Sequence, residues 1–154
     1  MENSHRGQIT VINFKVHDIY ASLDIDHIDK VIALPKIEPV PAGPIFLIGL
    51  LNLGGTVIPI IDLSIKLKIN QMHAYTINTP ILICKNSQNK FAGIIVDAVM
   101  DVATVRADML QKYEECLSGD EIVTACIKFP DMISLLLNID HLVRDGGVEG
   151  NAKE

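Results

Sequence analysis

Short runs of aliphatic and β-branched residues, separated by glycine, proline or polar turns, recur along the whole chain. The clearest case is residues 49–63, GLLNLGGTVIPIIDL, in which two apolar runs flank Gly54 and Gly55. Glycine adopts the positive φ angles of a tight hairpin turn, so this stretch is predicted to form strand, turn and strand. The second run ends at Asp62, and aspartate is a typical cap for a following helical turn.

The same pattern occurs twice along the chain. YASLDIDHIDKV (20–31) matches FAGIIVDAVMDV (91–102) at an offset of 71, VINFK (11–15) matches ILICK (81–85) at an offset of 70, and IIDL (60–63) matches LLNI (136–139) at an offset of 76. These matches predict two tandem units, near residues 11–67 and 81–142, each built mostly of strands. Each unit is too small to bury a core alone, so the two are expected to pack together, an arrangement in which strands can be swapped.

Helix signals are few. RADMLQKYEE (106–115) is predicted to be a helix because its apolar residues fall on one face, and four prolines between residues 35 and 44 predict an irregular crossing before the hairpin. The expected fold class is therefore all-β, with two small barrels and one or two short helices.

The apolar stretch at residues 45–61 could also be interpreted as a membrane span, since only Asn52 and Thr56 are clearly polar there. Seventeen residues are at the short limit for a hydrocarbon layer of about 30 Å. The paired glycines, Pro59 and the β-branched residues favour two buried strands instead.

Composition excludes several classes of partner. The net charge of −6 and an aromatic content of 5% argue against nucleic acid and against direct binding to an anionic membrane. The three cysteines, Cys84, Cys116 and Cys126, form no C-x-x-C pair, so they are expected to be reduced, buried thiols of a cytoplasmic protein.

Catalytic and metal-binding motifs are incomplete. The spacing Gly49-x4-Gly54-Gly55-Thr56 imitates a phosphate-binding loop but lacks its lysine. DIDHID (24–29) has no glycine at the sixth position of a calcium loop, and its alternation predicts a half-buried strand. The five histidines do not fall at metal-ligand spacing. We therefore expect no cofactor, no metal and no enzymatic activity.

Residues 49–63 also resemble the signature of the CheW family, the adaptor proteins of bacterial chemosensory arrays. That signature runs Gly, two residues, Asn-Leu-Arg-Gly, then an apolar strand through Pro to Asp-Leu. The matching residues are Gly49, Asn52, Leu53, Gly55, Pro59, Asp62 and Leu63. Gly54 departs from it, because the family usually has arginine there. AGIIVDAV (92–99) and MISLLLNID (132–140) resemble two further family landmarks, so the resemblance covers residues 8–144 as one domain and leaves 145–154 as a disordered tail.

The resemblance implies two five-stranded SH3-like barrels packed on a shared core. It also implies a non-catalytic scaffold that couples the cytoplasmic tip of methyl-accepting chemoreceptors to the regulatory domain of the histidine kinase CheA. Such a protein would be cytoplasmic and would reach the inner membrane only through the receptors. The alternative is a small β-barrel binding module for another protein or ligand, unrelated to chemotaxis.

By the same resemblance, Ile28 and Val31 would lie in the strand that contacts the receptor. Gly49, Asn52, Leu53 and Gly54 would lie beside the receptor and kinase surfaces, and Gly55 and Asp62 would form a structural turn. The aliphatic members are equally compatible with a role in the core.

Glycine at position 54 lacks the fixed charge and the five hydrogen-bond donors of the usual arginine, which affects partner binding rather than the fold. Because the family tolerates arginine there, the resemblance implies that Gly55, and not Gly54, has the positive φ angle.

Overall fold

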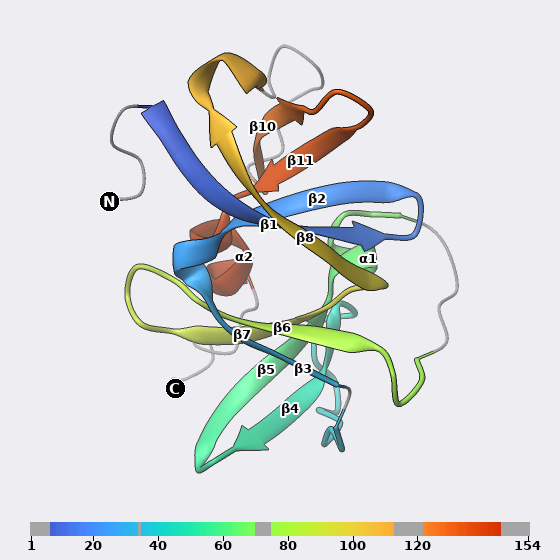
Figure 1. Cartoon of the computed structure of the whole chain (residues 1–154). Helices are drawn as coiled ribbons and strands as arrows, with labels where there is room; N and C mark the ends of the chain where they lie inside the picture. Colours follow the sequence, from blue (N-terminus) through green and yellow to red (C-terminus); the bar gives the residue numbers. More distant parts are fainter. Residues whose placement is uncertain (1–6, 34, 70–74, 113–121, 146–154) are drawn as a thin grey trace.

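Eleven strands form two mixed sheets in the computed structural model, which describes residues 7–33, 35–69, 75–112 and 122–145 (Figure 1). Sheet A has the order β8-β1-β2-β11-β10-β9, and sheet B has the order β3-β6-β7-β5-β4. The strands of sheet A are β1 (Gln8–Val16), β2 (Ile19–Asp24), β8 (Ala98–Arg106), β9 (Leu110–Lys112), β10 (Val123–Lys128) and β11 (Ile133–Leu137). Those of sheet B are β3 (Ile28–Ala33), β4 (Leu47–Leu53), β5 (Thr56–Asp62), β6 (Pro80–Lys85) and β7 (Phe91–Ile95).

The two sheets follow one pairing plan. In sheet A, β1 lies antiparallel between β8 and β2, and β2 lies parallel to β11. In sheet B, β6 lies antiparallel between β3 and β7, and β7 lies parallel to β5. The first hairpin of each half of the chain is therefore exchanged into the sheet that the other half completes.

The strand register repeats at the offsets seen in the sequence. Phe14 lies opposite Ala21 in the β1–β2 pair, as Cys84 lies opposite Ala92 in the β6–β7 pair. Each hairpin also contains the same kind of side-chain contact. Nζ of Lys15 lies 5.9 Å from the ring centroid of Tyr20, and Nζ of its counterpart Lys85 lies 5.8 Å from the ring centroid of Phe91. This correspondence supports the proposal that residues near 11–67 and 81–142 are two copies of one unit.

The largest hydrophobic core lies between the sheets. Alternate residues of β1 and β6, among them Phe14 and Leu82, enter it from the two sheets. Leu63 of helix α1 (Leu63–Lys66) and Leu142 of helix α2 (Ile139–Asp145) complete it, and both helices follow a strand that ends at the shared core (Figure 1). All four side chains are fully buried, and each such burial contributes about 1.5–3 kcal/mol. The opposite faces of the same strands fill two smaller clusters, one for each sheet.

An irregular crossing closes sheet B into a barrel. The proline-rich segment after β3 pairs with the edge strand β4 through two backbone hydrogen bonds between Glu38 and Leu50, of 2.9 and 2.8 Å. A side chain on Gly49 would place its Cβ 2.4 Å from the carbonyl oxygen of Glu38 and 2.6 Å from Cγ2 of Ile37. Glycine is therefore required at position 49 for the crossing to approach the strand.

The predicted helix at residues 106–115 is wrong. Strand β8 continues to Arg106, where it pairs with Gln8 of β1, and a 3-10 turn (Ala107–Met109) leads into strand β9. Pairing with neighbouring strands outweighs the local helical spacing. Residues 113–115 lie outside the described part of the chain.

The strand predicted through residues 24–29 is interrupted. Strand β2 ends at Asp24, whose Oδ1 accepts a hydrogen bond of 2.9 Å from the backbone N–H of Asp26 and caps a 3-10 helix at Ile25–His27. The chain must turn there because β2 belongs to sheet A, whereas β3 belongs to sheet B.

Other sequence expectations have mixed outcomes. Sheet A has six strands rather than five, because the three-residue β9 extends it beyond β10.

The apolar stretch at 45–61 forms β4 and most of β5, and no helix in the described residues is long and apolar enough to cross a membrane. The side chains of Cys84 and Cys126 are buried, whereas Cys116 and residues 146–154 of the expected tail lie outside the described residues.

Candidate partner-binding surface

The most open part of the candidate site is the turn between β4 and β5. Gly54 has a φ angle of +60° and Gly55 one of +91°, the pattern of a type I′ hairpin turn. The expectation that only Gly55 has a positive φ is therefore wrong. The side chain of Asn52 fixes the turn, since its Oδ1 accepts a hydrogen bond of 2.9 Å from the N–H of Gly55. Apart from the adjacent residues, no heavy atom of the described part of the chain lies within 4 Å of a Cβ built at either glycine, so the turn is open on this side.

Some of the predicted site residues on strand β4 lie on the surface, and others lie in the interior. Asn52 is exposed and lies opposite Val57 of β5, whose exposure is 59%. Leu53 is half-buried and packs against the interior cluster of sheet B, and Gly49 is covered by the crossing segment. Asn52, Gly54 and Val57 are among the exposed residues of this hairpin and are called the hairpin tip below.

Sequence reasoning missed Val57. The signal was present, because Ile58 and Ile60 alternate with Val57 and Pro59 along β5, and an alternating strand presents one face to solvent. Burial of the isoleucines in sheet B therefore leaves Val57 on the outer face.

The other predicted contact strand, β3, is an edge strand that pairs only with β6 within the described residues. Val31 is 44% exposed, whereas Ile28 is half-buried against the shared core. Between them, Asp29 and Lys30 are exposed, with 3.9 Å between carboxylate and ammonium, a pair that contributes little to stability. An exposed edge with one aliphatic side chain is a typical docking site for a partner strand or helix.

The structure does not join the two groups of predicted residues into one hydrogen-bonded surface. Strands β3 and β4 are the first and last strands in the order of sheet B and do not pair with each other; the proline-rich crossing, which follows β3 and pairs with β4, lies between them. The candidate site therefore has two parts, the β3 edge around Val31 and the hairpin tip.

Asp62 has a structural position at the end of β5. Its exposure is 3%, and its Oδ1 accepts hydrogen bonds from the backbone N–H groups of Ser64, at 2.9 Å, and Ile65, at 3.3 Å, which caps helix α1. The Tyr75 hydroxyl donates to Oδ2. Burial raises the pKa of the Tyr75 phenol, and the hydrogen bond to Asp62 raises it further.

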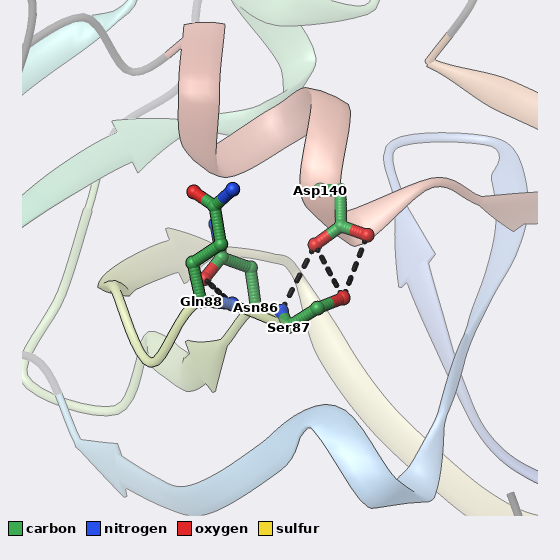
Figure 2. A pocket seen from close by; sticks show the side chains of 4 residues that line it. All are labelled: Asn86, Ser87, Gln88 and Asp140. Carbon is green, nitrogen blue, oxygen red and sulfur yellow. Dashed lines mark hydrogen bonds between the residues drawn. The ribbon is translucent and has the colours of Figure 1, made fainter.

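A polar pocket lies where the β6–β7 turn meets helix α2 (Figure 2). Ser87 donates from its backbone N–H to Oδ1 of Asp140, at 3.0 Å, and from its hydroxyl to Oδ2, at 2.8 Å. Asn86 accepts the N–H groups of Gln88 and Lys90, each at 2.9 Å. These bonds attach the turn to the helix. In the described residues, no group of three or more histidine, cysteine or carboxylate side chains could hold a metal ion.

Two β-barrels that share one core, with an exposed sheet edge and an exposed hairpin, define the class as a two-barrel all-β protein. The family model of the CheW-like domain matches residues 10–146. The chain therefore belongs to the CheW family.

Several relatives carry the same family name. The chain is 30% identical over 115 residues to the chemotaxis protein CheW of Rhizobium meliloti, covering 75% of this chain and 73% of that protein. It is 27% identical over 121 residues to the probable chemotaxis protein CheW of Rhizobium etli, covering 79% and 77%. The crystal structure of the scaffolding protein TtCheW from Thermoanaerobacter tengcongensis has the same fold, with a TM-score of 0.77, 24% identity, and coverage of 84% of this chain and 88% of that one. The predicted all-β, two-barrel fold is confirmed.

Proposed function

We propose that this protein couples chemoreceptors to the histidine kinase CheA as a non-catalytic adaptor. The observation that carries the proposal is the family match over residues 10–146, which includes both barrels and the hairpin tip. The partners are the cytoplasmic tip of methyl-accepting chemoreceptors and the regulatory domain of CheA. The adaptor works in the cytoplasm and reaches the membrane only through the receptors.

Coupling requires two surfaces that can be occupied together. The β3 edge suits the apolar face of a receptor helix, because Val31 is exposed on a strand that pairs on one side only within the described residues. The hairpin tip belongs to a different strand pair, β4–β5, and is proposed as the surface for the second partner. A protein that binds both partners at once raises the effective concentration of each partner for the other, and an adaptor needs no catalytic step to do this.

The variant Val31→Asp tests the receptor-binding part. A carboxylate forced into an apolar interface loses water without gaining a partner, so we expect the affinity for a receptor-tip fragment to fall at least about tenfold. The matched control is Ile133→Asp, which places the same charge on an exposed aliphatic residue of β11, where exposure is 61%. Titration calorimetry measures both. Equal affinities for the two variants would show that the β3 edge is not the receptor site.

A further inference from the structure

The outermost strands are β8 and β9 in sheet A and β3 and β4 in sheet B. An uncovered outermost strand is a template for pairing with another chain. Strand β9 has only three residues, and the crossing segment pairs with β4 through the backbone of Glu38. Strand β8 has nine residues and, within the described part of the chain, pairs only with β1. The longest open edge of the structure described here is therefore that of β8.

The sequence of β8 is typical of a strand that pairs with a copy of itself. The stretch AVMDVATV (98–105) has no proline or glycine and a single charged residue, Asp101. Met100 and Val102 are 45% and 57% exposed, and Thr104, which alternates with them, is exposed too. Segments with high β propensity, little charge and no proline associate readily when they are exposed. Asp101 is the residue of this stretch that opposes such association.

Asp101 points toward the neighbouring strand. It alternates with Ala103 and Val105, which pack in the interior cluster of sheet A. Its Oδ1 accepts a hydrogen bond of 3.0 Å from Nδ2 of Asn13 on β1, and the Ser22 hydroxyl donates to Oδ1 of Asn13. Asn13 and Ser22 are buried, whereas Asp101 is exposed. These bonds hold the carboxylate at the edge of the sheet, so it does not turn freely into solvent.

Strand β8 is also bulged at this point. Two of its residues, Met100 and Asp101, lie opposite the single residue Asn13 of β1. A bulge bends the strand and interrupts its ladder. Strand β3 has a bulge at the same place in the repeat, where Asp29 is the extra residue and the charged Lys30 follows it. A bulge and an inward-pointing charge are two of the features that keep outermost strands unpaired in natural proteins.

We propose that Asp101 prevents β8 from pairing with a second copy of this chain. A strand added to β8 would bring the carboxylate against another backbone, where it would lose water without gaining a partner. With an apolar residue at position 101, the stretch from Ala98 to Val105 would have no charge left to oppose pairing. This inference concerns the assembly state of the protein and is independent of the proposed adaptor function.

The variant Asp101→Val tests the proposal in the full chain. The matched control is Thr104→Val, which adds the same side chain at an exposed position of the same strand and keeps the carboxylate. Sedimentation velocity over a range of concentrations measures self-association, and hydrogen exchange followed by mass spectrometry locates the newly protected amides. We expect Asp101→Val to self-associate at least about tenfold more tightly than the parent, with new protection in β8. The control should sediment like the parent.

A charge returned to the same stretch should reverse the effect. The double variant Asp101→Val with Val102→Lys is expected to sediment like the parent, because the lysine again opposes strand pairing. If Asp101→Val does not fold, Asp101→Asn replaces it, since asparagine removes the charge and can still accept the hydrogen bond from Asn13. It should self-associate more tightly than the parent for the same reason.

Three results would overturn the proposal. The first is a folded variant without the charge at position 101 that sediments like the parent. The second is equal self-association of Thr104→Val, which would show that added apolar surface is sufficient. The third is self-association that protects amides elsewhere and leaves those of β8 unchanged.

Discussion

The variant Gly54→Arg restores the residue that the family signature has at the hairpin tip. Its structural cost is confined to the backbone, because Gly54 has a φ angle of +60° and, apart from the adjacent residues, no heavy atom of the described residues lies within 4 Å of a Cβ built there. A left-handed conformation costs a residue with a side chain about 1–2 kcal/mol. In a protein of this size, about 1 kcal/mol lowers the melting temperature by about 2–4 °C. We expect a fall of about 2–8 °C on that basis.

We expect Gly54→Arg to strengthen partner binding. A charge-assisted hydrogen bond to a partner carboxylate contributes about 1.5–3 kcal/mol, which is about tenfold to a hundredfold in affinity. The control Gly54→Gln carries the same backbone strain without the charge. Calorimetric titration with the receptor-tip fragment and with the CheA regulatory domain should show tighter binding of Gly54→Arg to at least one of them. If the arginine and glutamine variants bind both partners equally, the hairpin tip lies outside the contacts.

Two further predictions concern stability. Gly49→Ala should lower the free energy of unfolding by about 1–3 kcal/mol, because its Cβ would overlap the Glu38 carbonyl. The control Gly43→Ala should cost less, because a Cβ there would meet flexible side chains at 3.3 and 3.4 Å. Equal losses in urea denaturation would contradict the close approach of the crossing segment to Gly49. The raised pKa of Tyr75 means that the folded state holds the phenolic proton more firmly than the unfolded state. The contribution of this proton to the free energy of unfolding is therefore complete below about pH 10 and is lost as the pH rises above that value. Tyr75→Phe should reduce the alkaline fall in the free energy of unfolding. An unchanged dependence of that free energy on pH would refute this prediction.

Much of the fold follows from local sequence. The alternation and paired glycines of residues 49–63 predict the β4–β5 hairpin, and the resemblance of two apolar segments at offsets of 70 to 76 predicts that the halves share one pattern. These features depend on neighbours in the chain, which propensity and turn chemistry describe well.

The failures have a common physical cause in contacts between distant residues. The helix expected at 106–115 has the spacing of a helix, but Arg106 pairs with Gln8 across the sheet. The turn at Ile25–His27 exists because the chain passes from one sheet to the other, which alternation cannot show. Strand exchange itself leaves the apolar pattern of each strand unchanged, so alternation along a strand cannot show to which sheet the strand belongs.

The candidate site was located only in part. The resemblance places Val31, Asn52 and Gly54 at positions that the structure exposes, but it also includes Gly49, which the crossing segment covers. A sequence motif does not show whether a residue contacts a partner or allows two backbone segments to approach closely. The distance from a Cβ at position 49 to the Glu38 carbonyl assigns Gly49 to the second role.

The adaptor function itself is tested most directly by one binding measurement on the intact protein. A receptor-tip fragment is immobilised, and the CheA regulatory domain is passed over it with and without this protein, using the kinase and receptors of the same organism. The account predicts that the regulatory domain is retained only when this protein is present, and that Val31→Asp abolishes the retention while Ile133→Asp preserves it. Failure to retain the regulatory domain at any concentration, with the protein folded, would contradict the coupling function.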